Sequence, residues 1–149
     1  MQRPILTAPD KRLRMRSKKI SAREIKSGKI QRLIFDLVET MMDKDGIGLA
    51  GPQIGELLSV IAVQHKDEAI VLINPKICGK SFGKIVMEEG CLSVPGVFGL
   101  VKRPKSIRVK AFNQEGKAVD FKADSILARV IQHEVDHLDG ILFIDKLQK

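Results

Sequence analysis

Two segments of the chain place apolar residues at three- and four-residue steps, the spacing of one face of a helix. The first follows Ser27, whose hydroxyl suits an N-cap, and runs to about Met42. The second begins at Asp124 or Ser125 and continues until Gly140 stops it. Their apolar positions are Ile30, Leu33, Ile34, Leu37, Val38, Met41 and Met42, then Ile126, Leu127, Val130, Ile131 and Leu138. We therefore expect two amphipathic helices that pack into a core.

Between these helices the pattern is typical of β-strands. Residues 59–63 and 69–73 are short β-branched runs, and residues 106–112 alternate polar and apolar side chains. Residues 113–116 are typical of a hairpin turn that returns through 118–123. Weaker strand signals lie at residues 77–82 and 84–87. The order of helix, antiparallel-type strands and helix predicts an α+β fold, with mixed or antiparallel sheets packed around the second helix.

Composition adds a size and a charge to this picture. The 149 residues contain no repeat or linker, so we expect a single domain over residues 1–149. All six aromatic residues are Phe, which disfavours base stacking and leaves the core to Ile, Leu, Val and Met. The net charge of +8 fits either a solvated basic surface or an anionic partner such as RNA, a ribosome or a membrane face. Basic residues are enriched near the start, at Lys11, Arg12, Arg14, Arg16, Lys18 and Lys19.

The chain shows neither an apolar run long enough to cross a bilayer nor a secretory signal pattern at its start. We therefore expect no membrane partner and a cytoplasmic location of the bacterial type, or an equivalent reducing compartment. In such a compartment Cys78 and Cys91 remain thiols, either as small buried hydrophobes or as reactive or metal-binding groups.

The second predicted helix carries the residues of a metal site. His133 and His137 are four residues apart, so both imidazoles lie on one helix face and reach a common ion. Glu134 follows the first histidine and is placed to take a proton from metal-bound water. This H-E-x-x-H arrangement is typical of metallohydrolases. The alternative is a pair of polar residues on a solvated helix face.

Two histidines leave a catalytic metal short of its usual third protein ligand. The candidates are Cys91, Cys78 and the many carboxylates. Cys91 follows Gly90, which permits an unusual backbone, and precedes Pro95, which we expect to end the strand. Such a position presents a side chain from a strand edge, whereas Cys78 lies in a strand-like run and reads as a small buried hydrophobe.

A glycine-rich segment, residues 46–55, follows the first helix. It matches neither a dinucleotide fingerprint nor a P-loop, because no strand precedes it and no Lys-Ser/Thr follows. It is either a tight connecting turn or a loop that brings backbone close to a substrate. In the second case the Gln53 amide would lie in the cleft and donate a hydrogen bond to a developing oxyanion.

Taken together, these three segments resemble the signature motifs of the peptide deformylase family, in the family's order. Residues 46–53 resemble its G-ϕ-G-L-A-A-x-Q motif, residues 89–93 its E-G-C-L-S motif and residues 132–137 its Q-H-E-x-D-H motif. Shorter similarities extend the resemblance over nearly the whole chain, at Pro9-Asp10 with Leu13-Arg14, at Leu72 to Pro75 and at Leu142 to Asp145.

The resemblance implies a metallohydrolase that removes the formyl group from the N-terminal formyl-methionine of newly made peptides. Cys91, His133 and His137 would bind one divalent metal, natively Fe²⁺, with Zn²⁺, Ni²⁺ or Co²⁺ as replacements. Glu134 would take a proton from the bound water that attacks the formyl carbon, and return it to the amine as formate leaves. The oxyanion would be held by the metal, by the amide of Gln53 and by the backbone N–H of Leu92.

By position, the resemblance also assigns the substrate contacts. The pocket for the methionine side chain would be bordered by Ile47, Met87, Ile126, Arg129, Val130 and His133, with backbone contacts from Gly48 and Gly90. Arg129 falls where some relatives have an apolar residue. We expect its aliphatic stem to line the pocket while its charge reaches solvent.

Three positions depart from the family's pattern. Gly51 replaces the usual second Ala of the first motif, which we expect to loosen the loop. Phe98 stands where some bacterial members carry an Arg. The chain ends two residues after Leu147, where several members continue into a helix that docks on the ribosome. A transient ribosome contact is thus a weaker expectation than binding of formylated nascent peptides, and we expect no specific nucleic acid.

Two other functions are compatible with parts of this pattern. An H-E-x-x-H metallopeptidase would cleave internal peptide bonds, but only nine residues follow Gly140, and they contain no further His or Glu ligand. A non-catalytic or weakly active basic protein that binds ribosome or RNA would retain the metal residues without using them. Release of formate from formyl-Met-Ala-Ser discriminates both from a deformylase.

Overall fold

The computed structural model describes residues 1–149. Its helices are α1 (Ala22–Ile25), α2 (Gly28–Asp43) and α3 (Ser125–Leu138), with 3-10 turns η1 (Lys11–Arg14), η2 (Gly51–Ile54) and η3 (Phe143–Lys146). Its strands are β1 (Gly48–Ala50), β2 (Val60–His65), β3 (Glu68–Lys80), β4 (Lys84–Cys91), β5 (Val94–Pro104), β6 (Ser106–Phe112) and β7 (Ala118–Asp124). All pairings between these strands are antiparallel, so the predicted α+β fold is confirmed.

Both predicted helices are present at the expected positions. Helix α2 begins after Ser27, whose side chain accepts a hydrogen bond from the Ile30 amide at 3.3 Å. Helix α3 begins after Asp124 and ends at Leu138, two residues before Gly140. The positive φ of 74° at Gly140 explains why a glycine follows the helix end. None of the helices has the length and apolar content needed to span a membrane.

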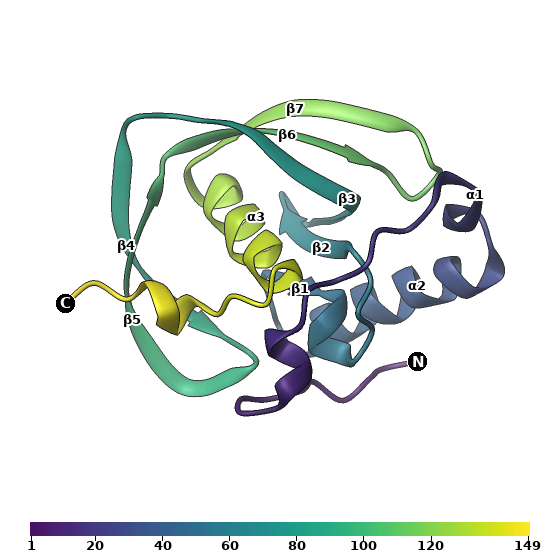
Figure 1. The fold of residues 1–149 in the computed structure, drawn as a ribbon, viewed down its shortest axis with the longest axis horizontal. Helices are drawn as coiled ribbons and strands as arrows, with labels where there is room; N and C mark the ends of the chain where they lie inside the picture. Colours follow the sequence, from purple (N-terminus) through teal and green to yellow (C-terminus); the bar gives the residue numbers. More distant parts are fainter.

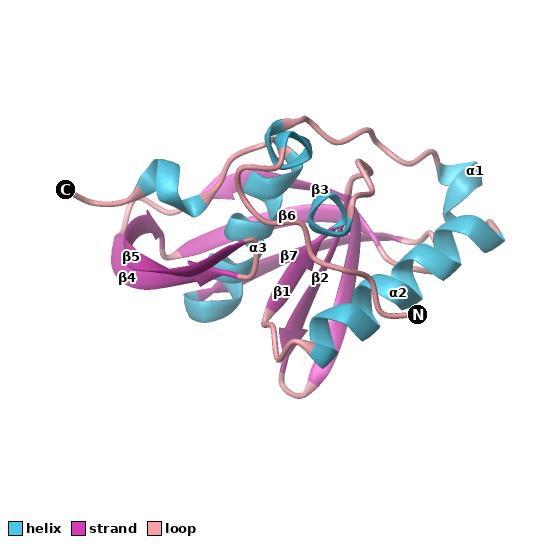
Figure 2. Ribbon diagram, turned by 90° about the horizontal axis from the view of Figure 1, so that it is seen from below, coloured by secondary structure: helices cyan, strands magenta, loops and turns pink.

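A five-stranded sheet in the order β1-β2-β3-β6-β7 lies between the two helices (Figures 1 and 2). Both faces of strand β2 are apolar because a helix packs against each of them. Val60 and Ala62 pack with α2, whereas Ile61 and Val63 pack with α3 on the opposite face. The sheet covers one side of helix α3 and the hairpin β4–β5 covers the other, so the helix is enclosed (Figure 1).

The hairpin β4–β5 is where the sequence prediction was least accurate. Strand β5 was not predicted, and Pro95, which was expected to end a strand, is its second residue. Proline has no backbone N–H to donate to a neighbouring strand. It is tolerated at the second position of β5 because a two-stranded sheet leaves one edge of each strand free. A third apolar cluster fixes the hairpin to the N- and C-terminal segments through Leu13, Val94, Val101, Leu142 and Phe143.

Candidate metal centre and active site

Helix α3 presents two histidines toward the hairpin. His133 and His137 lie one turn apart, with ring centroids separated by 5.0 Å. The His137 imidazole is fully buried, because the helix is covered on one side by the sheet and on the other by the hairpin. The expectation that both imidazoles face one place is therefore met.

Cys91, at the end of β4, completes this group. Its sulfur lies 3.3 Å from Nε2 of His137. The ligand atoms of Cys91, His133 and His137 all lie within 4.8 Å of one another, which is close enough to share one ion. Cys78 is an exposed residue of β3 outside this group, so the expectation that it is a buried hydrophobe was wrong.

The surroundings of these residues fit a bound cation. Oε1 of Glu134 and Nδ1 of His137 are buried without any hydrogen-bond partner. Burial raises the pKa of Glu134 to about 7 and lowers the pKa of His137 to about 3. A buried carboxylate without a partner is costly, and an oxygen coordinated to a cation held by the three ligands would supply the missing partner of Glu134. Nε2 of His137, which faces the Cys91 sulfur, is the nitrogen available to such a cation.

Glu89 is a functional residue that the sequence reasoning missed. Its Oε1 lies 2.9 Å from Nδ1 of His133. Burial alone would raise the pKa of Glu89, but the hydrogen bonds from His133 and Arg103 outweigh it and hold that pKa well below its usual range. The ionised carboxylate can only accept, so Nδ1 of His133 donates and Nε2 is left for a metal.

The negative charges of Glu89 and the Cys91 sulfur favour a cation beside His133. Burial alone would lower the pKa of His133, but the Cys91 sulfur and the Glu89 carboxylate outweigh it and raise that pKa to about 10. In the chain without metal they stabilise the protonated imidazole. A divalent cation held by Cys91 and both histidines would take over this electrostatic stabilisation and release the proton.

Two buried arginines hold Glu89. Arg103 donates to both of its oxygens, at 2.6 and 2.9 Å, and also to Asp136 at 2.9 Å. Arg129 donates to Oε2 of Glu89 at 2.6 Å. The expectation that the Arg129 charge reaches solvent was therefore wrong. Its guanidinium is buried because a carboxylate and two backbone carbonyl oxygens receive it.

The predicted oxyanion donors lie beside the ligands. Oε1 of Gln53 accepts a hydrogen bond from the Ala50 amide at 2.9 Å, which orients the side chain. Its Nε2 donates to the Ser93 hydroxyl at 3.1 Å and points to the Cys91 sulfur at 3.6 Å. The Leu92 amide makes no hydrogen bond within the protein. The Gln53 amide therefore lies next to the ligand group, and Leu92 follows Cys91 in the chain and lines the same cavity.

The glycine-rich segment folds into strand β1 followed by the turn η2. A Cβ at Gly48 would lie 2.6 Å from Oε2 of Glu134 and 2.8 Å from a Val130 methyl group, so only glycine allows this close approach. Gly51 was expected to loosen the segment, but it is held in a tightly packed position. It is buried, and a Cβ there would lie 2.7 Å from the Leu58 carbonyl oxygen.

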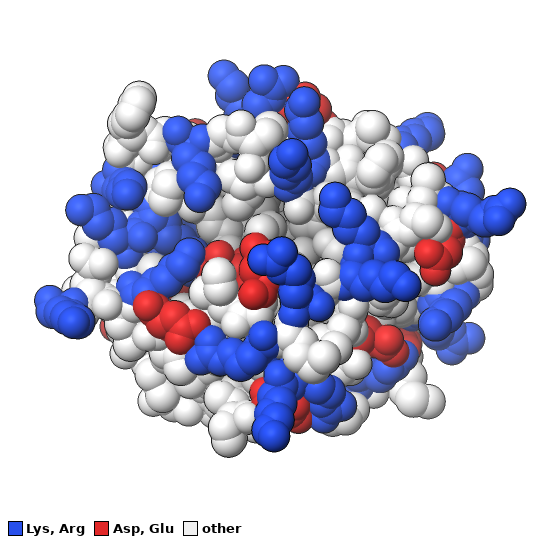
Figure 3. Space-filling view, viewed as in Figure 1, with Lys and Arg blue, Asp and Glu red and all other residues white.

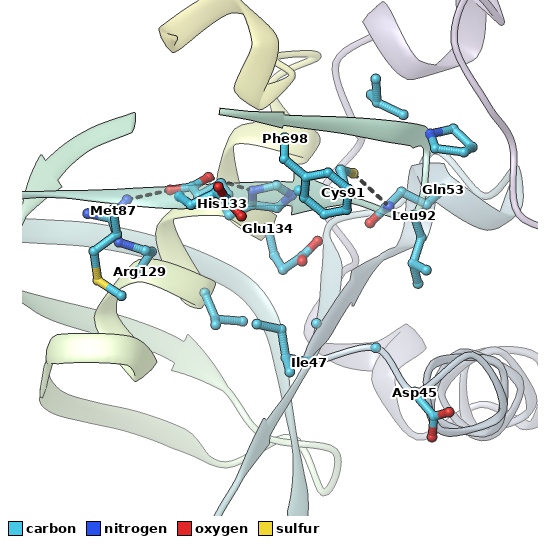
Figure 4. A pocket seen from close by; sticks show the side chains of 18 of the residues that line it. Asp45, Ile47, Gln53, Met87, Cys91, Leu92, Phe98, Arg129, His133 and Glu134 are labelled. Carbon is cyan, nitrogen blue, oxygen red and sulfur yellow. Dashed lines mark hydrogen bonds and ion pairs between the residues drawn. The ribbon is translucent and has the colours of Figure 1, made fainter. Parts of the chain in front are cut away.

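A cavity of about 460 Å³ opens beside Cys91 and His133 (Figure 4). All the residues predicted to contact substrate line it, namely Ile47, Gly48, Met87, Gly90, Ile126, Arg129 and Val130, together with Gln53, Leu92, His133 and Glu134. Gly90 is needed for packing and not for an unusual backbone. Its φ is not positive, and a Cβ there would lie 2.6 Å from the ring of Phe98, another cavity residue.

Known proteins with this sequence pattern and fold are deformylases. A peptide deformylase of Psychrobacter arcticus is 43% identical over 149 residues, covering 98% of this chain and 79% of that protein. The crystal structure of peptide deformylase from Thermotoga maritima matches with a TM-score of 0.95 and 35% identity, covering 100% of this chain and 99% of that one. A Met-Ala-Ser-bound class I type b peptide deformylase from Acinetobacter baumannii matches with a TM-score of 0.94 and 32% identity, covering 99% of each chain.

The model of the family described as polypeptide deformylase matches residues 2–149, nearly the whole chain. The match includes all three segments that form the site. The chain therefore belongs to the peptide deformylase family, a family of metallohydrolases that remove N-formyl groups.

Proposed function

We propose that this deformylase hydrolyses formyl-methionine at the N-terminus of newly made peptides, with Cys91, His133 and His137 holding one divalent metal. One observation carries the assignment. The ligand atoms of Cys91, His133 and His137 lie within 4.8 Å of one another, and two of these residues, Cys91 and His133, line the same cavity as Glu134. A site built only for metal storage would not need a carboxylate whose pKa is raised to about 7 by burial.

Each protein group then has a role that its position supports. A bound divalent cation supplies Lewis acidity, which polarises a carbonyl group and lowers the pKa of bound water. Glu134 accepts the proton of the attacking water and later returns it to the departing amine nitrogen. The amides of Gln53 and Leu92 donate hydrogen bonds to the oxygen that becomes negatively charged. Glu89 keeps His133 in the tautomer that leaves Nε2 free for the metal.

The cavity suits a methionine side chain. Met87, Ile126 and Val130 offer apolar walls, and the stem of Arg129 closes one side while its guanidinium is engaged elsewhere. Gly48 and Gly90 line the same cavity and would offer their backbone groups to a peptide. In support, the related A. baumannii enzyme has Met-Ala-Ser bound.

We propose Fe²⁺ as the native ion, with Zn²⁺, Ni²⁺ or Co²⁺ as substitutes in purified protein. One thiolate and two imidazoles suit all of these ions, so the preference for iron rests on the family resemblance. Anaerobic purification followed by metal analysis tests it. Zinc in anaerobic protein that is fully active would contradict the proposal for iron. A cytoplasmic location and a transient contact with the ribosome stay predictions.

The decisive experiment compares two glutamates of the same cavity. Glu134→Gln keeps the shape of the buried side chain but removes the base, so release of formate from formyl-Met-Ala-Ser should fall by about 10²-fold or more while metal content stays unchanged. Glu88→Gln alters an exposed carboxylate of the cavity and should keep most of the activity. Full activity of the Glu134 variant would refute the proposed base. Cys91→Ser with unchanged metal content would refute the ligand assignment.

A further inference from the structure

A second cavity lies on the other side of helix α3. Its volume is about 970 Å³, against about 460 Å³ for the candidate active site, and the two share no lining residue. Val135 and Leu138 of α3 line the second cavity, whereas Val130 and His133 line the first. Since a helix makes a full turn in about 3.6 residues, these two sets lie on opposite helix faces.

Basic side chains surround this second cavity, which we call the basic groove. Figure 3 shows the face hollowed near its middle, with lysine and arginine side chains gathered around the hollow. The N-terminal segment supplies one wall and strands β3 and β6 supply another. The cations that line the groove are Arg16, Lys19, Lys76, Lys80 and Lys110, all exposed.

The acidic residues of the groove already have cationic partners. Asp120 accepts two hydrogen bonds of 2.9 Å from Arg108. Asp136 is bound by Arg103 at 2.9 Å and by Lys146 at 3.0 Å. Asp139 lies 4.0 Å from Arg16. Because these carboxylates are neutralised within the protein, the four lysines are left without an ion pair, and the groove has a positive potential.

The placement of two of these lysines opposes stability. Lys76 of β3 stands directly opposite Lys110 of β6 in the antiparallel register. Like charges at directly opposite positions destabilise a strand pair. On its other side Lys110 stands opposite Asp120 of β7, which offsets part of this repulsion, and an anion bound between the two lysines would offset more of it.

We propose that the basic groove binds the phosphate backbone of RNA. Four of its five cations are lysines, which act as point charges toward phosphate. Where this protein binds carboxylates tightly, it uses the guanidinium fork of arginine instead, as at Arg103 and Arg108. An RNA strand carries one negative charge per nucleotide and can contact both walls of the groove at once.

The contact is independent of base sequence. The aromatic residue of the groove, Phe112, is half-buried against the core, and the most exposed rings, Phe35, Phe82 and Phe98, lie outside the groove. The groove therefore presents no fully exposed ring for stacking on bases. Phosphate contacts without base contacts position a protein on RNA and carry no sequence information. Because the groove and the active site lie on opposite faces of α3, a bound RNA leaves the peptide cavity open.

The test uses the full, metal-loaded chain and a labelled single-stranded uridine oligoribonucleotide, with binding followed by fluorescence anisotropy over a range of salt concentrations. One variant carries Lys76→Gln, Lys80→Gln and Lys110→Gln. Its control carries Lys26→Gln, Lys29→Gln and Lys84→Gln, three exposed lysines outside the groove with the same change in net charge. We expect the groove variant to bind about tenfold or more weakly, with a plot of log K against log salt that is shallower by about 2.

The control variant should bind almost as the parent does. Equal weakening in both variants would show that net charge alone attracts the RNA and would overturn the proposal. Tighter binding of poly-glutamate than of RNA at the groove would overturn it in favour of an acidic protein. Lys76→Gln alone should raise Tm while it weakens RNA binding. Formate release from formyl-Met-Ala-Ser should be the same in all variants, so failure of this proposal is distinguishable from failure of the proposed function.

Discussion

Arg129 donates a hydrogen bond of 2.6 Å to Glu89, across the boundary between helix α3 and the hairpin β4–β5. The same arginine donates to the carbonyl oxygens of Val101 at 3.0 Å and Ile85 at 2.6 Å, one on each strand of the hairpin. Through Glu89 it also supports the orientation of His133. A single buried side chain therefore joins the helix that carries two ligands to the strand pair that carries the third.

Replacing this arginine tests its part in metal binding. Arg129→Met keeps the aliphatic stem but leaves the Glu89 carboxylate with one partner fewer, so metal affinity should fall by about 10- to 100-fold. Loss of one partner of a buried ion pair should also lower the free energy of unfolding by about 3–5 kcal/mol. Chelator competition and urea unfolding measure the two effects, and Arg129→Lys should recover part of both. As a control, Arg108→Met removes an exposed arginine bound to Asp120, and it should leave metal affinity unchanged.

Amide hydrogen exchange separates a positioning role from a general loss of stability. In Arg129→Met, exchange should accelerate in β4 and β5 more than in the five-stranded sheet, because the hairpin loses its bonds to α3. Unchanged metal affinity together with uniform acceleration would contradict the positioning role.

Gly48→Ala should impair catalysis without removing the metal. The added methyl group would lie 2.6 Å from Oε2 of Glu134, so the carboxylate must move away from its place beside the ligands. A displacement of this size should lower kcat by about 10²-fold. Steady-state kinetics and metal analysis check the prediction, and Gly28→Ala, where nothing lies within 4 Å of the new Cβ, is the control. Wild-type kcat in the Gly48 variant would show that Glu134 tolerates the shift.

Restoring the family's usual alanine at position 51 should destabilise this chain. In Gly51→Ala the new Cβ would lie 2.7 Å from the Leu58 carbonyl oxygen and 2.8 Å from that of Glu56, and backbone atoms cannot move as a flexible side chain can. We expect a loss of about 1–3 kcal/mol in the free energy of unfolding. Urea denaturation measures it, with Gly83→Ala as a neutral control because nothing lies within 4 Å of its Cβ.

The pair of Arg14 and Asp145 should contribute to stability in a pH-dependent way. The side-chain hydrogen bond from Arg14 holds the pKa of Asp145 below its ordinary value. A lowered pKa in the folded state means that the contribution is present above the unfolded-state pKa and is lost as pH falls through the folded-state pKa. Asp145→Asn should therefore cost about 0.2–1 kcal/mol near neutral pH.

That cost should shrink in acid, once Asp145 is protonated in the parent protein as well. Urea unfolding across this pH range measures the difference. A double-mutant cycle with Arg14→Gln isolates the pair from other effects of the substitution. A difference that stays constant down to strongly acid pH would show that the ion pair is not its cause.

The helices and much of the site follow from patterns that are local in the sequence. The apolar periodicity after Ser27 and the four-residue spacing of His133 and His137 concern neighbours on one helix, so they can be read without knowing what the helix packs against. The resemblance of the glycine-rich and cysteine segments to family motifs added Cys91 and Gln53. In the structure Cys91, His133 and His137 form one ligand group, and Gln53 lines the cavity beside it.

Only the tertiary structure shows the features of the site that depend on contacts between residues far apart in the chain. The residues alone left Cys78 and Cys91 as alternatives, and only the position of β4 beside α3 shows which sulfur lies 3.3 Å from His137. In the sequence Glu89 is one carboxylate among many, whereas in the fold the hydrogen bonds from His133 and Arg103 hold its pKa well below its usual range and Arg129 adds a further hydrogen bond. Local periodicity reports which side chains share a face, whereas burial and charge pairing depend on contacts between residues far apart in the chain. The sequence therefore identified the ligands on the helix, and the packing of the hairpin against that helix decided their third partner and their support.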